Sequence, residues 1–344
     1  MCEGNLPSER RRVAKQRMLQ KRENPWDHGR ASEHVGRWRK VGCAGLWGLA
    51  ALALLGQDAL ATHQIAHCRP EPADILFAPD FPALQDHEWG YPIGGWGGIA
   101  KRHPLQHHPV IFIHGNTRDA GDWDDPGRSV KQQFLNAGYS MQELWAISYN
   151  GQSTRELSRA SQCRTTNQAN VSDLAVFVKA VLAYTGSSKV DLVAHSLGVT
   201  LARAMLAEYP ELADQVEDFV AIAGPNHGTT VCRRWWLIWV IGWKDFIGCD
   251  ELVPGSRWLK KLNGPNGEKE GRGPVRYLTI YDGTGADWFY LPWLFGLPVG
   301  DQESPALKGA ENHPMPGLSH DELRTHPDAV TVYVDFVARR SGSP

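Results

Sequence analysis

A serine between two small residues is the feature of this sequence that most clearly suggests chemistry. Residues 189–198 read KVDLVAHSLG, so Ala194 lies two residues before Ser196 and Gly198 two residues after it. An apolar strand leading through such a serine into a helix predicts a nucleophile elbow, whose sharp turn needs small residues on both sides. The bare pattern is short enough to arise by chance, so its place between a strand and a helix carries the prediction.

A second motif could stabilise negative charge beside that serine. Residues 111–116 read IFIHGN and end another apolar strand, where Gly115 would let the backbone approach a substrate. In this arrangement two backbone N–H groups bind the developing oxyanion, one from this loop and one from the residue after the nucleophile. We therefore expect Asn116 and Leu197 to supply them. The alternative interpretation is a strand-end turn with an incidental His-Gly pair.

A serine nucleophile also needs a base and an acid, in the chain order Ser, Asp/Glu, His. Two carboxylates, Asp282 and Asp287, follow the apolar run in YLTIYDGTGADWFY, and the residues alone leave both open as the acid. His320 lies in the loop GLSH directly before the last predicted helix, which is the expected place for the base. His313 and His326 each precede a proline and are more typical of exposed loops.

The elements that would position these groups alternate along the chain. Short apolar runs rich in β-branched residues predict buried strands, and runs with apolar residues every three or four positions predict helices. Such an alternation predicts an α/β fold with a mostly parallel sheet covered on both faces. Strands are expected at residues 109–114, 143–149, 190–194, 219–223 and 275–281, and helices at 126–137, 170–184, 197–209 and 328–340.

Two stretches interrupt the alternation, at about residues 225–273 and 283–304, and both are rich in Gly, Pro and Trp. We expect them to be insertions at the carboxyl end of the sheet, beside the serine. One interpretation is a hydrophobic cap over an acyl pocket or a lipid or polymer surface, with Trp235, Trp239 and Trp288 in contact with substrate. The other is a secondary core in which the aromatic rings pack on each other.

The first residues of the chain have the features of an export signal. Residues 41–56 are apolar and uncharged, basic residues precede them, and Ala59-Leu60-Ala61 follows. This pattern predicts a leader over residues 1–61, cut after Ala61, and a secreted or periplasmic protein. The alternative is an uncleaved membrane anchor through residues 41–60, although Gln57 and Asp58 oppose it. We expect an irregular segment over residues 62–108 and one domain over 109–344.

Charge and cysteine content narrow the function classes further. The net charge of −2 combines +6 in residues 1–40, −1 in residues 41–61 and −7 in residues 62–344, and an acidic domain argues against nucleic-acid binding. The chain has no C-x-x-C or H-E-x-x-H motif, so we expect no metal site. Cys232 and Cys249 bracket a short stretch and are expected to form a disulfide, which would leave Cys68 and Cys163 as a second pair.

Taken together, HPVIFIHGN, VDLVAHSLGV, AIAGPNHGT and GLSH resemble the class 2 (Bacillus-type) lipases. They also resemble extracellular polyhydroxyalkanoate depolymerases, and the likeness covers roughly residues 105–340. The resemblance implies an α/β-hydrolase fold and no cofactor, and it favours Asp287 as the acid, because Gly285-Ala286-Asp287 matches a turn of these lipases. The expected function is a secreted serine ester hydrolase. The alternatives are a polymer depolymerase and, less favoured, a non-catalytic protein that binds hydrophobic ligands.

Overall fold

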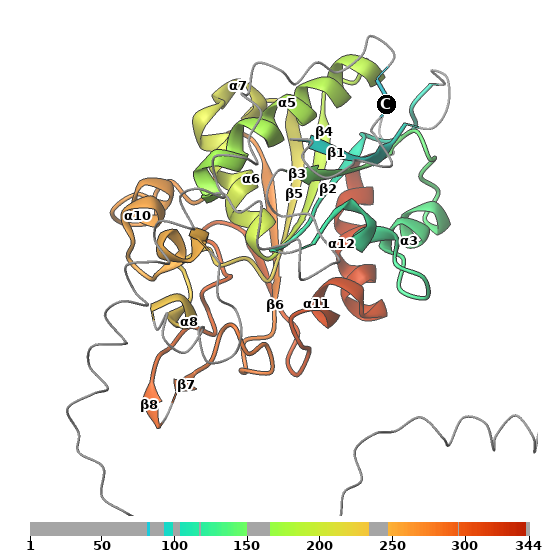
Figure 1. The fold of residues 1–344 in the computed structure, drawn as a ribbon. Helices are drawn as coiled ribbons and strands as arrows, with labels where there is room; N and C mark the ends of the chain where they lie inside the picture. Colours follow the sequence, from blue (N-terminus) through green and yellow to red (C-terminus); the bar gives the residue numbers. More distant parts are fainter. Residues whose placement is uncertain are drawn as a thin grey trace, which may run out of the picture. The chain divides into compact units, whose positions relative to one another are not determined.

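A mostly parallel sheet forms the centre of the part of the chain that the structure describes (Figure 1). The computed structural model describes residues 81–82, 93–98, 104–116, 118–149, 166–233, 247–294 and 296–341, so the predicted leader lies outside the described residues. Within these ranges seven strands pair in the order β1-β3-β2-β4-β5-β6-β9. Only the β1–β3 pair of this sheet is antiparallel.

The five strands expected from the sequence are all present. Their side chains are almost entirely buried, as expected for parallel strands with helices on both faces. Their bounds differ from the predicted ones by at most three residues. They are β2 (Val110–Ile113), β3 (Leu144–Tyr149), β4 (Val190–His195), β5 (Val216–Ile222) and β6 (Arg276–Tyr281).

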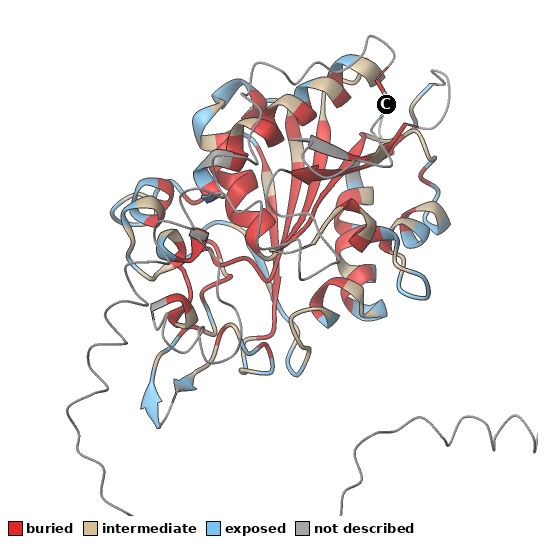
Figure 2. Ribbon diagram, viewed as in Figure 1, coloured by how far each residue is buried: buried red, intermediate tan, exposed pale blue. Residues whose placement is uncertain are grey.

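Helices cover both faces of this sheet, and each face has its own hydrophobic core. Figure 1 shows α5 (Asn167–Thr185), α6 (Leu197–Glu208) and α7 (Pro210–Ala213) on one side. On the other side lie α3 (Val130–Asn136) and α12 (Pro327–Ser341). The helices bury the surface that faces the strands and expose the opposite surface (Figure 2). The predicted α/β-hydrolase architecture is confirmed.

Four strands of the described residues were not expected from the sequence. β1 (Ile93–Gly97) lies in the segment predicted to be irregular, and its sequence IGGWG has three glycines and no alternation. β9 (Glu311–Pro314) is polar and partly exposed, and joins the sheet edge by backbone pairing with β6. A short hairpin, β7 (Trp293–Leu294) and β8 (Leu297–Pro298), forms in the second insertion. The described side chains of these strands are partly or fully exposed, so they give no hydrophobic pattern.

Both insertions follow strands at the carboxyl edge of the sheet. The first contains α8 (Thr230–Arg233), a 3₁₀ turn η3 (Ile247–Leu252) and α10 (Arg257–Asn263), and the second contains the β7–β8 hairpin (Figure 1). The predicted disulfide between Cys232 and Cys249 is present, whereas Cys68 and Cys163 lie outside the described residues. No helix in the described ranges is long and apolar enough to cross a bilayer, and residues 41–60 are not among them.

Candidate active site

Ser196 occupies a strained turn between β4 and α6. Its φ of 55° and ψ of −125° lie in a region that residues other than glycine rarely adopt. Ser196 is also the N-cap of α6, yet in this fully described helix its hydroxyl makes no capping hydrogen bond. A Cβ on Gly198 would come within 2.4 Å of the His114 carbonyl, so only glycine fits there. The hydroxyl is therefore held in a strained position and is not used to cap the helix.

The loop after β2 packs directly against this turn. A Cβ on Gly115 would lie 2.9 Å from Ser196 Cβ, so the absence of a side chain is what allows the approach. Asn116 follows Gly115, and Leu197 is the first residue of α6. The N–H groups of a helix's first turn lack intrahelical acceptors and lie at the positive end of its dipole. The structure thus places Gly115, which precedes Asn116, against the serine turn, and Leu197 directly after Ser196.

Asp287 and His320 form a hydrogen-bonded pair. His320 Nδ1 lies 2.7 Å from Asp287 Oδ2, and Asp287 Oδ1 accepts the backbone N–H of Phe289 at 3.1 Å. Asp287 is buried, and only 12% of the His320 side chain is exposed. The other two late histidines lie elsewhere: His313 is in β9, and His326 caps the short helix α11 (Glu322–Thr325) and pairs with an exposed aspartate.

Asp282, the alternative acid, holds the loops that carry this pair. Its carboxylate accepts the Thr284 hydroxyl and the backbone N–H groups of Thr284, Gly285 and Ala286, with a longer contact to that of Asp287. It also accepts the Gly317 N–H at 2.7 Å, from the loop that leads to His320. Burial alone would raise the pKa of Asp282, but these hydrogen bonds outweigh it and lower the pKa. The Asp282 carboxylate is thus hydrogen-bonded by backbone N–H groups and one hydroxyl of these two loops.

His195 contacts the backbone of the base. Its Nε2 lies 3.0 Å from the His320 carbonyl oxygen, and the two rings are 4.7 Å apart. Burial, together with the nearby charges of His320 and Arg324, lowers the pKa of His195 well below its ordinary value. His195 is therefore neutral near pH 7, and because a carbonyl can only accept, its proton is on Nε2. Its contacts join the end of β4 to the loop of His320.

Aromatic side chains line the acid loop beside His320. The Phe289 ring lies 4.3 Å from the His320 ring, and Trp288 packs on Phe289 at 4.1 Å. Farther along, Trp293 and Leu297 on the hairpin are 60% and 58% exposed. Trp235 and Trp239 lie outside the described residues. The sequence places Phe289 in the aromatic cluster after the acid, but only Trp288 of this pair was expected to contact substrate.

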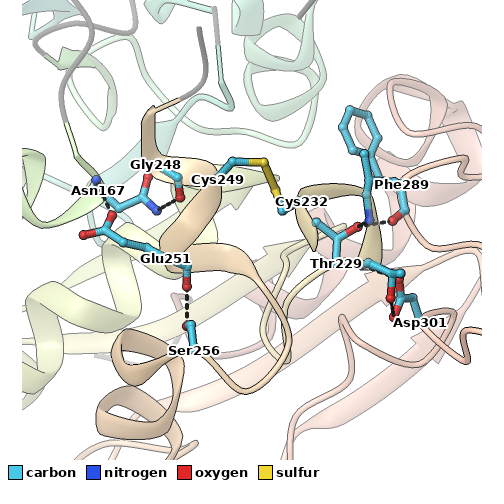
Figure 3. Close-up of a disulfide and its surroundings, with 11 residues drawn as sticks. Asn167, Thr229, Cys232, Gly248, Cys249, Glu251, Ser256, Phe289 and Asp301 are labelled. Carbon is cyan, nitrogen blue, oxygen red and sulfur yellow. Dashed lines mark hydrogen bonds between the residues drawn. A yellow bond between two sulfur atoms is a disulfide. The ribbon is translucent and has the colours of Figure 1, made fainter. Parts of the chain in front are cut away.

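The disulfide segment and the acid loop are both tied to the loop after β5 (Figure 3). Thr229 Oγ1 donates to the Phe289 carbonyl at 2.6 Å. The next residue, Thr230, donates its hydroxyl to Asp301 at 2.8 Å. Three residues after Thr229, Cys232 bonds to Cys249, beside Gly248, whose carbonyl accepts the Asn167 amide at 3.0 Å. These contacts hold the first insertion to α5 and to the backbone of Phe289.

The histidines near the amino end of the sheet have structural partners. His107 Nδ1 lies 3.3 Å from Glu143, and His108 Nδ1 lies 3.9 Å from Asp191. The described residues contain no group of three His, Cys, Asp or Glu side chains that could hold a metal ion.

One family model matches about half of this chain, and solved structures share its fold. The family model "Lipase (class 2)" matches residues 107–284, which include Ser196 but end before Asp287 and His320. Lysosomal acid lipase/cholesteryl ester hydrolase of Macaca fascicularis is 24% identical over 181 residues, 45% of this chain and 41% of that protein. The chain thus matches about two fifths of the length of this curated relative.

Two solved lipase structures are similar in fold. The mature form of a Bacillus licheniformis lipase, BlEst2, matches with a TM-score of 0.54 and 20% identity over 72% of this chain and 99% of that one. Aspergillus fumigatus lipase B matches with a TM-score of 0.55 and 19% identity over 84% of this chain and 68% of that one. At these identities the likeness shows the α/β-hydrolase fold.

Proposed function

Because the chain belongs to the class 2 lipase family, we propose that it hydrolyses carboxylic esters with Ser196 as nucleophile, His320 as base and Asp287 as acid. The observation that carries this proposal is the 2.7 Å contact between His320 Nδ1 and Asp287 Oδ2. The loop of His320 also contacts His195, the residue before Ser196. An aspartate that accepts Nδ1–H leaves Nε2 free to take a proton from a hydroxyl. The strained, uncapped hydroxyl of Ser196 is the group that such a base would activate.

The proposed reaction has two steps that share one oxyanion site. Ser196 Oγ attacks the ester carbonyl while His320 Nε2 takes the hydroxyl proton, and the N–H groups of Asn116 and Leu197 bind the oxyanion. His320 then gives this proton to the leaving alcohol, which leaves an acyl group on Ser196. In the second step water attacks the acyl-enzyme while His320 takes the water proton, and the same two N–H groups bind the oxyanion. His320 then returns the proton to Ser196, and the carboxylic acid product is released.

The aromatic surface beside His320 suits a hydrophobic acyl chain. Phe289 and Trp288 form an apolar wall next to the base, and Trp293 and Leu297 extend it to the exposed hairpin. Trp side chains are enriched where apolar and aqueous phases meet, so this surface would rest on a lipid or polymer aggregate. We propose acyl glycerols or related hydrophobic esters as substrates, met outside the cytoplasm after export through the N-terminal segment.

A fluorophosphonate probe tests the nucleophile directly. The wild-type protein is expected to be labelled covalently and to hydrolyse p-nitrophenyl butyrate, and Ser196→Ala is expected to lose both properties with an unchanged melting temperature. Ser172→Ala, at a half-buried position of α5, is the matched control and should be labelled like the wild type. A wild-type protein that binds hydrophobic ligands but takes no label would overturn the enzyme in favour of a binding protein.

Two further measurements identify the substrate class and the location of the protein. Activity on tributyrin emulsions and on polyhydroxybutyrate films distinguishes a lipase from a polymer depolymerase, and we expect tributyrin to be the better substrate. N-terminal sequencing of the protein recovered outside the expressing cells is expected to begin at Thr62. A product that remains in the membrane fraction with residues 41–60 intact would contradict cleavage and favour an anchor.

A further inference from the structure

Two successive carbonyl groups just before Asn116 are hydrogen-bonded by buried side chains. The His114 carbonyl accepts the Tyr149 hydroxyl at 2.8 Å, and the Gly115 carbonyl lies 2.7 Å from His114 Nδ1. The Gly115 carbonyl also has longer contacts, to the Tyr149 hydroxyl at 3.5 Å and to the Arg118 N–H at 3.4 Å. Tyr149 and His114 are almost completely inaccessible to solvent.

The contact between His114 and Gly115 fixes the proton on the His114 ring. A carbonyl oxygen can only accept a hydrogen bond, so Nδ1 must carry the proton and donate it. The ring itself is held by stacking on Tyr149, with centroids 4.0 Å apart and planes 6° from parallel. Tyr149 thus acts on the loop twice, through its hydroxyl on the His114 carbonyl and through its ring on the His114 imidazole.

The direction of the Gly115 carbonyl determines the direction of the next N–H. A trans peptide is planar, and its N–H points opposite to its C=O. Tyr149 ends β3, which neighbours β2 on the side away from β4. A Gly115 carbonyl held by contacts on this side turns the Asn116 N–H toward β4, where Ser196 stands.

We propose that Tyr149 and His114 are positioning residues that set the orientation of the Gly115–Asn116 peptide, and so prepare the oxyanion site before substrate binds. This inference rests on the proposed function, in which the Asn116 N–H is one of two oxyanion donors. Gly115 must lack a side chain to approach Ser196, and the same lack leaves its peptide free to rotate. A rotated peptide would present a carbonyl to the developing negative charge, which would raise the barrier.

Three variants test the proposal through kcat and KM for p-nitrophenyl butyrate. Tyr149→Phe keeps the ring stack but removes the hydroxyl, and it is expected to lower kcat about tenfold. His114→Leu removes the donor to Gly115 and should lower kcat by about 100-fold, the loss typical of one oxyanion donor. KM should stay within about twofold in both, because the ground-state ester makes little use of the site. His114→Asn, whose amide nitrogen can occupy the place of Nδ1, should recover most of the His114→Leu loss.

A matched control separates this role from general stability. Tyr333 is also buried and also donates its hydroxyl to a carbonyl, that of Arg324 at 2.7 Å, but it lies in α12 on the opposite face. Tyr333→Phe should lower the melting temperature about as much as Tyr149→Phe does, and should leave kcat unchanged.

An inhibitor that forms an oxyanion provides the second measurement. The serine hydroxyl adds to the carbonyl of a trifluoromethyl ketone and forms a tetrahedral adduct with an oxyanion. The matching secondary alcohol cannot form this adduct and only occupies the place of the substrate's acyl chain. In Tyr149→Phe and His114→Leu the ketone affinity should fall in proportion to kcat, and the alcohol affinity should not change. Wild-type kcat and ketone affinity in both variants, or equal losses for ketone and alcohol, would overturn this inference alone. An unlabelled wild-type protein in the fluorophosphonate experiment would overturn the proposed function as well.

Discussion

Two pairs of buried aspartates lie at opposite ends of the same sheet and differ in how many hydrogen-bond donors they have. Asp282 and Asp287 follow β6 at its carboxyl end, where backbone N–H groups, one hydroxyl and His320 donate to them. Asp191 and Asp218 lie near the amino ends of β4 and β5. Within the described residues, one oxygen of each carboxylate in this second pair has no hydrogen-bond donor.

The partners of Asp191 and Asp218 offset only part of the cost of burying their charge. Arg276 donates to Asp218 at 2.6 Å, the Asp218 N–H donates to Asp191 at 3.1 Å, and His108 lies 3.9 Å from Asp191. Burial raises the pKa of Asp218 to about 7, because the Arg276 contact is outweighed once the neighbouring Asp191 charge adds to the burial. Burial also raises the pKa of Asp191. The two carboxylates therefore hold a proton under conditions in which Asp282 holds none.

The difference follows from where backbone donors are available in a parallel sheet. A residue inside a strand has neighbours whose N–H groups are already bound in the sheet, so Asp191 and Asp218 find few. The turn after β6 is outside the ladder, and Asp282 collects the donors of Thr284, Gly285 and Ala286 there. Loops at the carboxyl end can thus keep a buried carboxylate charged, which is what a triad acid requires.

The largest test of this comparison exchanges one carboxylate at each end for an amide. Asp287→Asn should lower kcat by about 10⁴, because an amide cannot hold the His320 tautomer that leaves Nε2 free. Asp191→Asn, the matched variant at the amino end, should leave kcat unchanged. The measurement is steady-state hydrolysis of p-nitrophenyl butyrate with melting temperatures for both variants. Equal losses of kcat in the two would remove the functional difference between the ends.

A smaller effect is expected from Asp282→Asn, and mainly on stability. The amide keeps one acceptor oxygen and turns an N–H toward backbone N–H groups, which should lower the free energy of unfolding by about 3 kcal/mol. kcat should fall about tenfold, because the loops of Asp287 and His320 both lose their anchor.

The pH dependence of this variant distinguishes a charged anchor from a packing role. The native pKa of Asp282 is lowered, so its contribution is fully present above the unfolded value near pH 4 and is lost as pH falls through the native value. Urea unfolding should therefore show a wild-type advantage that shrinks below about pH 4. An advantage that stays constant down to pH 2 would show that the charge of Asp282 is not what holds the loops.

The strands that the sequence predicted are those whose side chains are mostly apolar and buried. β2 to β6 are short runs rich in apolar residues because helices cover both of their faces. β9 could not be found in this way, since ENHP joins the sheet through backbone pairing and keeps polar side chains. The same holds for the glycine-rich β1, which pairs with β3 at the other edge.

The candidate site divides along a similar line. Ser196 and His320 were predicted from spacing, because the elbow and the loop before the last helices are local patterns. The preference for Asp287 over Asp282 needed a family resemblance, and the role of Asp282 depends on the conformations of two loops that sequence spacing does not specify. Tyr149 acts across neighbouring strands, 35 residues from His114, and no local pattern connects the two.

The smallest test acts on the amino end alone and has a definite sign. The native pKa of Asp218 is about 7, above the unfolded value near 4. Between these values the native state binds a proton that the unfolded state does not, so this group lowers stability as pH rises from about 4 to 7. Asp218→Asn removes that titration and keeps an oxygen for Arg276. The stability of the variant relative to wild type should rise across this range by about 2 kcal/mol, less than the full shift implies, because Arg276 and His108 are partly exposed to solvent.

Urea unfolding at pH 5, 6, 7 and 8 measures this difference, and Asp191 provides its check. The charge of Asp191 is one of the causes that raise the Asp218 pKa, so Asp191→Asn should reduce the pH dependence that Asp218 confers on the wild type. A relative stability that is flat with pH would mean that Asp218 is charged in the native state throughout. The two ends of the sheet would then handle buried charge alike, and the supply of backbone donors would no longer explain why the proposed acid stands at the carboxyl end.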